Sequence, residues 1–435
     1  TGAALLVHAH NTLINNASLH HESAAALRVK MSTKDKLTAA AAGAAIALVV
    51  SRYLKKQAPY DATHDEVRAI VRPNIRKLEP YRCARDDYED GVLLDANENA
   101  YGACVKSDEA LVKAALKFDL HRYPCPHQRT VKDRVASFRG VKRDNVFVGV
   151  GSDEAIDLLF RVFCEPRTAN VVVTPATYGM YKVCAATQDV EVRSANLLPE
   201  SFDVDVDAVE SQVDANTRLV FLCSPGNPTA RQVSRQTVER LLASPKLQRT
   251  IVVVDEAYVD FAPEPSTAPL VKKYPRLVVL HTLSKAFGLA GVRCGTAIGS
   301  PATIHYMNAV KAPYSINKMT SCLAAEALSS PSLAALKAVV KDTLRERERL
   351  AARLASLPYV CTVFPSDANF LLVRLTQHDK AKPLYTKLAE SGVVVRYRGD
   401  QANLSGCIRV TVGTPSDSDA LLKLLGEVAP SFGLV

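Results

Sequence analysis

Several short apolar runs, rich in valine and other β-branched residues, recur along the chain and end in polar residues or glycine turns. They begin at Val146, Asn170, Arg218, Thr250 and Leu277. β-Branched residues favour strands, and a strand that is apolar at nearly every position is buried on both faces. With helices between them, these runs predict an α/β fold in which a mostly parallel central sheet is covered by helices on both sides.

The C-terminal third follows a different pattern. Residues 324–357, apart from a Ser-Ser-Pro break at 329–331, are rich in Ala, Leu, Arg and Glu and predict helix. Runs starting at Asn369, Val393 and Cys407 predict strands, and a short helix is expected near residues 420–428. We therefore expect a large domain over 96–328 and a smaller α/β C-terminal domain over 329–435. Prolines and an Asn/Asp-rich stretch make 59–95 an extended arm that contributes to the small domain. An amphipathic helix is predicted over 131–138.

The first 58 residues form an N-terminal extension of distinct composition. They carry seven Lys and Arg against two acids, which is +5 of the total net charge of +9. Leu37 to Val50 is an apolar, Ala-rich run flanked by lysines and an arginine. It is shorter than the roughly 18 residues of a spanning helix. A targeting presequence, a short membrane anchor and an exposed or disordered alanine-rich helix all remain open. We expect a cytoplasmic protein, with mitochondrial or other organellar targeting as the alternative.

The charge and the cysteines exclude several function classes. The remaining +4 is spread over 377 residues, which gives no case for nucleic acid and is compatible with anionic small molecules. Ten cysteines are distributed singly, with no Cys-x-x-Cys pair and no metal-ligand spacing. We expect reduced thiols in a reducing compartment and no metal site.

The segment from Leu280 to Gly295 carries the strongest chemical signal. A buried strand ends at Ser284-Lys285 and is followed by glycines and Arg293. Ligands of open α/β sheets bind at the carboxyl ends of the strands. A lysine buried there has a lowered pKa and can attack a carbonyl, which is the requirement for a Schiff-base lysine. A lone Ser-Lys is more often an exposed lysine, but Ser-Lys-Ala-Phe-Gly-Leu-Ala-Gly-Val-Arg closely resembles the pyridoxal-phosphate lysine segment of fold-type I aminotransferases.

If Lys285 binds pyridoxal phosphate, the other strand ends must supply the remaining groups. A buried carboxylate such as Asp255 keeps the pyridine nitrogen protonated. Asn227 and Tyr258 can donate to the phenolate oxygen of the ring. Tyr178 is placed to stack on the ring. Taken alone, Asp255 reads as a helix cap, Asn227 as a turn residue and Tyr178 as ordinary packing.

The cofactor phosphate and the anionic group of the substrate both need cations and N-H donors. Ser284, Arg293 and the turn Gly151, Ser152 and Asp153, where Ser152 or Asp153 is expected to cap a helix, can hold the cofactor phosphate. Arg396 and Arg409, thirteen residues apart on adjacent predicted strands, can bind an anionic substrate bidentately. Solvent-facing arginines are the alternative for that pair.

Eight motifs in order extend the resemblance from residue 70 to the end. They are Leu-Glu-Pro-Tyr-Arg (78–82), Leu-Asp-Ala-Asn-Glu-Asn (94–99), Arg-Tyr-Pro (122–124), Gly-Ser-Asp-Glu (151–154), Ser-Pro-Gly-Asn-Pro-Thr (224–229), Asp-Glu-Ala-Tyr (255–258), the Lys285 segment and Leu-Ser-Gly-Cys-Ile-Arg-Val-Thr-Val-Gly-Thr (404–414). Together they resemble the histidinol-phosphate aminotransferase family. The extension 1–58 has no counterpart in that resemblance.

The resemblance implies a homodimer in which Tyr123 reaches the cofactor phosphate of the neighbouring subunit and contributes to substrate binding. It also implies that Asn227, Arg396 and Arg409 bind the substrate, as histidinol phosphate in one half-reaction and glutamate or 2-oxoglutarate in the other. Lys285, Asp255 and Tyr258 are the expected catalytic residues. An aromatic amino acid aminotransferase, a decarboxylase of a phosphorylated amino acid and a scaffold without activity are the alternatives on the same fold.

Overall fold

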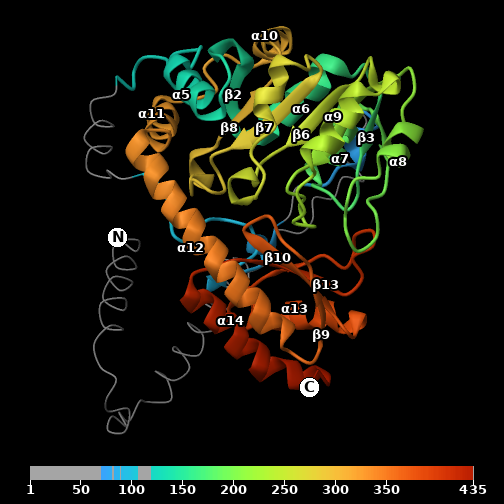
Figure 1. Cartoon of the computed structure of the whole chain (residues 1–435), viewed down its shortest axis with the longest axis vertical. Coiled ribbons are helices and arrows are strands. Elements are labelled where there is room, and N and C mark those ends of the chain that lie inside the picture. Colours follow the sequence, from blue (N-terminus) through green and yellow to red (C-terminus); the bar gives the residue numbers. More distant parts are fainter. Residues whose placement is uncertain (1–69, 81–82, 89, 106–118, 435) are drawn as a thin grey trace, which may run out of the picture. The chain divides into compact units, whose positions relative to one another are not determined.

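The central element of the fold is a seven-stranded sheet with the strand order β2-β8-β7-β6-β5-β3-β4 (Figure 1). The computed structural model describes residues 70–80, 83–88, 90–105 and 119–434. The chain divides into two units, Thr1–Val71 and Arg72–Val435, and the elements below belong to the second. The strands of the sheet are β2 (Val146–Val150), β3 (Asn170–Val173), β4 (Glu191–Ser194), β5 (Thr217–Cys223), β6 (Ile251–Asp255), β7 (Leu277–Thr282) and β8 (Cys294–Ile298).

Strand direction confirms the predicted mostly parallel sheet. β4, β3, β5, β6 and β7 pair in parallel, whereas β8 is antiparallel to both of its neighbours, β7 and β2. The last residues of β5 and β6, Cys223 and Asp255, are register partners. The polar ends of the parallel strands therefore meet at one edge of the sheet, as expected for a ligand site in an α/β fold.

Helices cover both faces of this sheet because its strands alternate apolar side chains between two buried cores. Val220, Leu222, Val252 and Val254 face one core, and Phe221 and Val253 face the other. The first core contains residues of α5 (Arg129–Arg139), α8 (Val206–Ser211), α9 (Arg235–Ala243), α11 (Lys318–Ala327) and α12 (Ser330–Ala355). The second core contains residues of α6 (Gly151–Phe163), α7 (Met180–Gln188) and α10 (Pro301–Val310).

The C-terminal third forms a second, antiparallel sheet with the order β12-β13-β10-β9. Its elements are β9 (Val360–Val363), β10 (Phe370–Leu375), α13 (Ala381–Glu390), β12 (Arg396–Tyr397), β13 (Cys407–Thr411) and α14 (Pro415–Val428). The arm joins it through β1 (Val92–Leu93), which pairs in parallel with β11 (Val393–Val394). The single strand predicted from Val393 is therefore wrong in detail, since the chain changes partner between β11 and β12.

The predicted helix break at 329–331 is shorter in the structure. Ser329 caps α12 by accepting a hydrogen bond from the Ser332 N-H, so the helix starts at Ser330 and includes Pro331. Proline is tolerated in the first turn because its missing N-H would have no helical partner there. α11 and α12 meet at an angle of 69°.

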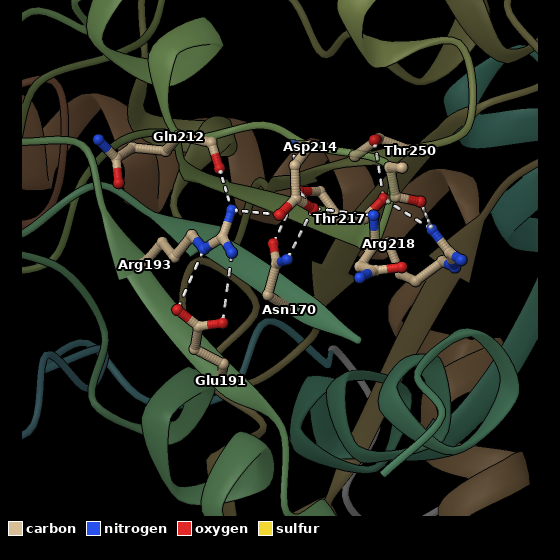
Figure 2. Close-up of polar contacts among 10 residues, drawn as sticks. Asn170, Glu191, Arg193, Gln212, Asp214, Thr217, Arg218 and Thr250 are labelled. Carbon is tan, nitrogen blue, oxygen red and sulfur yellow. Dashed lines mark hydrogen bonds and ion pairs between the residues drawn. The ribbon is translucent and has the colours of Figure 1, made fainter. Parts of the chain in front are cut away.

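A polar network joins the opposite, amino-terminal ends of the sheet strands (Figure 2). Asn170 donates to Asp214 at 2.9 Å and accepts from Thr217 at 2.7 Å. Arg193 forms an ion pair with Asp214 at 2.8 Å, and Thr250 donates to the Thr217 carbonyl. The Asn170 amide, with the Arg193 charge, lowers the pKa of the Asp214 carboxyl well below its usual range. These bonds occupy the polar groups at the amino-terminal ends.

Several sequence expectations concern residues outside the described ranges. The extension 1–58, its apolar run Leu37 to Val50, and Tyr81 and Arg82 all lie there. Among the described helices, none alone has the length and hydropathy of a membrane span, and only the bent pair α11 and α12 reaches them jointly. The ten cysteines all lie in described segments and are free thiols. Within the described segments, no group of three or more His, Cys, Asp or Glu is arranged to hold a metal ion.

Candidate active site

A cavity of about 410 Å³ lies at the carboxyl ends of β5, β6 and β7 and extends to β12 and β13. Most of the predicted site residues line it. They are Ser152, Asp153, Tyr178, Asn227, Asp255, Tyr258, Ser284, Lys285, Arg293, Arg396 and Arg409. The structure thus brings together side chains from segments up to about 250 residues apart in the sequence, as expected where parallel strands end together. Gly151 and Tyr123 are the two predicted residues that do not line it.

Asp255 is the last residue of β6 and is 3% exposed. Burial raises the pKa of its carboxyl to about 6, because the charged form loses its hydration. Hydrogen bonds from the Tyr181 hydroxyl to Oδ2 (2.7 Å) and from the Ala257 N-H to Oδ1 (3.2 Å) oppose that shift. The carboxylate is therefore held in one orientation at the floor of the cavity.

Lys285 lies in the turn after β7 and is half-buried. Burial lowers the pKa of this amine to about 8, and the charge of Arg409 contributes in the same direction. Nζ donates to the Ala96 carbonyl at 2.9 Å and lies 5.7 Å from the centroid of the Tyr258 ring. An amine with this pKa has an appreciable neutral fraction at neutral pH, which is the form that attacks a carbonyl.

The turn at residues 150–153, where α6 begins, is the candidate binding site for the cofactor phosphate, called the anion seat below. Its helix cap differs from the one predicted. The helix begins at Gly151, with Val150 as its cap residue and no side-chain cap, so neither Ser152 nor Asp153 is a cap. Glu154 accepts from the Val150 N-H instead, at 2.6 Å. The Gly151 N-H donates to the Arg293 carbonyl at 3.2 Å, and the next N-H groups of α6, which no capping side chain occupies, can bind an anion at the positive end of the helix dipole.

Two glycines make this seat possible. Gly151 has φ +73°, and a Cβ there would lie 2.6 Å from Nη2 of Arg293. A Cβ on Gly295 of β8 would lie 2.2 Å from the Ser152 nitrogen. The start of α6 rests directly on the β8 backbone, so larger residues at either position would displace it.

Arg293 and Ser284 border the same seat. Nη2 of Arg293 lies 3.5 Å from Oδ2 of Asp153, and Nη1 donates to the Ala290 carbonyl. The Ser284 N-H donates to Thr282 Oγ1, whose hydroxyl donates to Ser284 Oγ. The Ser284 hydroxyl therefore keeps its own hydrogen for a ligand.

The two tyrosines of the cavity are fixed by hydrogen bonds. The Tyr178 hydroxyl donates to Asp153 at 3.0 Å, and its ring meets the Tyr181 ring edge-on at 5.7 Å. The Tyr258 hydroxyl accepts from the Asn97 amide at 3.0 Å, which leaves its own hydrogen free to donate into the cavity. Burial raises the pKa of Tyr258 to about 12 and that of Tyr178 still further, so both stay protonated.

Arg409 is buried at the other end of the cavity. Its Nη1 donates to Oδ1 of Asn227 at 2.6 Å and its Nη2 to the Asp95 carbonyl. Arg396 is its register partner across β12 and β13, which confirms that the two arginines lie on adjacent strands. The Asn227 amide nitrogen is left to donate into the cavity, since its oxygen is taken by Arg409.

Tyr123 lies away from this cavity within one chain. It is 79% exposed, and its ring stacks on that of Tyr314 with centroids 4.5 Å apart. Within one chain, Tyr123 is therefore not among the predicted residues that line this cavity.

Sequence reasoning missed four residues of the site. Tyr181 lies inside α7 and has the pattern of a core aromatic residue. Asn97, at φ 53°, lies in a motif that reads as a turn. Thr282 ends β7, and Arg398 follows Arg396 by two residues, the spacing that puts both on one face of a strand. Only Arg398 and Thr282 had a signal in the sequence pattern.

These groups fit pyridoxal phosphate. Lys285 can take its aldehyde, the buried Asp255 its ring nitrogen, Asn227 and Tyr258 its phenolate oxygen, and the α6 seat with Ser284 and Arg293 its phosphate. An α/β fold with this set of groups at the carboxyl edge of its sheet defines the class of lysine-bound pyridoxal-phosphate enzymes.

Comparison with known proteins narrows this class. The family described as aminotransferase class I and II matches residues 89–425. The histidinol-phosphate aminotransferase of Saccharomyces cerevisiae is 43% identical, over 83% of this chain and 97% of the relative. That of Parabacteroides distasonis is 42% identical, over 83% and 98%. A crystal structure of the Sinorhizobium meliloti histidinol-phosphate aminotransferase, 24% identical over 83% of this chain and 98% of its own, superposes with a TM-score of 0.73 and shows the same fold. The chain belongs to the class I and II aminotransferases, and within them to the histidinol-phosphate aminotransferase family.

Proposed function

We propose that this protein transfers an amino group between histidinol phosphate and 2-oxoglutarate, with pyridoxal 5'-phosphate bound through Lys285. The products are imidazole-acetol phosphate and glutamate. The observation that carries the proposal is that a half-buried lysine whose amine has a lowered pKa, a buried carboxylate and a buried arginine line one cavity. The identity of 42–43% to relatives named for this activity supports the choice of substrates.

The chemistry divides between the cofactor and the chain. When bound, pyridoxal phosphate supplies an electron-withdrawing ring that stabilises negative charge at the reacting carbon. Asp255 would hold the ring nitrogen in its protonated form, and the hydroxyl of Tyr181 keeps that carboxylate oriented and favours its ionised form. Asn227 and Tyr258 donate to the phenolate oxygen, which stabilises its charged form.

Lys285 moves the proton. With the cofactor bound, the neutral amine of Lys285 would be the base that accepts the proton from the substrate carbon, and the protonated amine would be the acid that gives it back. The pKa of about 8 places both protonation states within reach near neutral pH. Arg409 and Arg396 hold the anionic end of the substrate, which keeps the reacting carbon at Lys285 during the transfer.

We also propose that the active unit is a homodimer with shared sites. Four exposed apolar side chains belong to two segments that the stacked pair Tyr123 and Tyr314 joins. They are Leu120, Tyr123, Tyr314 and Met319. A second copy that covers this surface would bring Tyr123 toward the other copy's cofactor phosphate.

The direct test is a donor comparison on the purified protein loaded with pyridoxal phosphate. Histidinol phosphate should convert the cofactor absorbance to that of the amine form in a single turnover, and 2-oxoglutarate should restore it. Phenylalanine should react at least about 100-fold less efficiently if the site is built for a phosphate. Carbon dioxide release without need of an oxo acid would instead identify a decarboxylase, and efficient use of phenylalanine would identify an aromatic aminotransferase.

A further inference from the structure

Three arginines, not two, share the sheet face that closes the anionic end of the cavity. Arg398 lies two residues after Arg396, and its N-H donates to the Cys407 carbonyl at 3.0 Å, so the β12 ladder continues through it. Side chains at a spacing of two residues lie on the same face of a strand. Arg409 is the register partner of Arg396 and shares that face. All three side chains line the cavity.

The charges of these arginines act on one another. Burial and the positive charge of Arg398, followed by that of Arg396, lower the pKa of Arg409 to about 9. The nearest acid acting on Arg409, Asp95, is bound by Arg85 at 3.2 Å. Of the other cavity acids, Asp153 pairs with Arg293, and Asp255 is bonded to Tyr181. Three guanidinium groups on one face of this end of the cavity favour an anion, and a dianion more than a monoanion.

Some of the N-H donors of Arg409 already have hydrogen-bond partners in the protein. Its two Nη atoms bond Asn227 and the Asp95 carbonyl, and its buried Nε has no partner in the part of the chain that the structure describes. A carboxylate has one charge and two oxygens, which Arg409 and Arg396 can satisfy. A phosphate monoester has up to two charges and three terminal oxygens, and it requires further donors.

We propose that Arg398 is a specificity-determining residue that binds the second charge of a phosphate-bearing substrate and contributes little to binding of a carboxylate. This inference rests on the proposed function, because it assigns the phosphate of the amino donor to this end of the cavity. It explains how one arginine cluster serves two different anions: Arg409 and Arg396 bind both, and Arg398 distinguishes them.

The test compares two half-reactions of the holoenzyme in single turnovers followed by cofactor absorbance. Arg398→Gln removes the charge, Arg398→Lys keeps the charge without the planar fork, and Arg353→Gln replaces an exposed arginine of α12 outside the cavity. Arg398→Gln should raise the half-saturating concentration of histidinol phosphate by about 30-fold and that of glutamate by less than about 3-fold. For Arg398→Lys, the half-saturating concentration of histidinol phosphate should lie between those of the wild type and Arg398→Gln. Arg353→Gln should have the wild-type values for both substrates.

Inhibition by inorganic phosphate gives an independent readout. In the wild type, phosphate should compete with substrate more strongly than acetate does, and its advantage should grow as pH rises through the second phosphate pKa of about 6–7. Arg398→Gln should lose most of that pH-dependent gain while acetate inhibition stays unchanged. Circular dichroism shows whether each variant is folded.

The outcomes separate the two proposals. Equal losses for histidinol phosphate and glutamate, or no loss for either, would overturn the role of Arg398. If the wild type reacts with glutamate but not with histidinol phosphate, the proposed function fails, and the phosphate and acetate competition alone decides the role of Arg398. A loss confined to phosphate would then support it, and equal losses would overturn it.

Discussion

The hydroxyl of Tyr181 donates a 2.7 Å hydrogen bond to Oδ2 of Asp255, and both side chains are buried. Tyr181 also stacks on Phe221 of β5, with ring centroids 4.5 Å apart. The tyrosine therefore cannot turn away from the carboxylate without leaving the core between α7 and the sheet. It acts as a positioning residue, since it reaches the cofactor only through Asp255.

Tyr181→Phe removes this hydrogen bond and keeps the packing. The pKa of Asp255 should rise above its wild-type value of about 6, because the bond favours the ionised form. Activity should fall about tenfold at pH 6 and less at pH 8, so the acidic limb of the pH profile moves to higher pH. Tyr306→Phe, at an exposed tyrosine, is the matched control. An unchanged acidic limb would show that Tyr181 only packs.

Asp255→Asn should separate stability from activity. The folded-state pKa of about 6 lies above the unfolded value, so ionised Asp255 costs stability at neutral pH and costs none below about pH 4. The apoprotein of the variant should be more stable than the wild type by about 3 kcal/mol above pH 6. The gap should close as pH falls from 6 to 4, while transamination is lost throughout. Thermal unfolding of both apoproteins measures this, and a gap independent of pH would contradict it.

Lys285→Ala should abolish amino transfer and leave the fold intact. The variant should also lose the cofactor band that borohydride fixes to the wild-type chain. In the wild-type apoprotein, the rate of covalent capture of pyridoxal phosphate should rise as pH increases through about 8, because only the neutral amine attacks. Stopped-flow absorbance follows the capture. Appreciable turnover by Lys285→Ala would remove this lysine from the mechanism.

Gly295→Ala should weaken the cofactor phosphate seat without touching a catalytic group. The added methyl would lie 2.2 Å from the Ser152 nitrogen, so the start of α6 must move. We expect the affinity for pyridoxal phosphate to fall at least about tenfold, measured by equilibrium titration of the apoprotein. Gly426→Ala is the control, since a Cβ there meets nothing within 4 Å. If Gly295→Ala binds pyridoxal phosphate with wild-type affinity, the cofactor phosphate does not bind at the start of α6.

Mixing two inactive variants tests the shared site. If Tyr123 serves the neighbouring subunit, a hybrid of Lys285→Ala and Tyr123→Ala chains contains one site with both residues intact. Co-refolded mixtures should recover activity, up to about half the wild-type value per hybrid dimer. Each variant refolded alone is the control. Recovery no greater than the residual activity of Tyr123→Ala would assign Tyr123 to its own chain.

The apolar runs and their polar ends were sufficient to predict the parallel strands and the site edge. This is because burial on both faces leaves a periodic signal in the sequence, and parallel strands share one carboxyl edge. Lys285, Asp255 and Arg409 were found because each follows or lies in such a run. The common cavity of Lys285 and Asp255 is a consequence of that topology, whereas Arg409 reaches the cavity from the second, antiparallel sheet.

The residues that were missed owe their roles to tertiary contacts. Nothing in α7 distinguishes Tyr181 from any other core aromatic until the Asp255 side chain is placed beside it. The Ala96 carbonyl accepts a hydrogen bond from the Lys285 amine, although 189 residues separate the two positions in the sequence. The absence of a side-chain cap on α6 likewise could not be predicted from the sequence. It depends on the side chain of Glu154, which accepts from the Val150 N-H, while neither Ser152 nor Asp153 caps the helix.

The bond from Arg409 to the Asp95 carbonyl joins positions 314 residues apart. During synthesis, the residues that bind the cofactor have all been made before β13 leaves the ribosome. A chain that ends before Arg409 can therefore contain both Lys285 and Asp255 and still lack the arginine that we propose binds the amino donor. The ability of this enzyme to select its substrate therefore arises only after the segment that contains Arg409 has been translated.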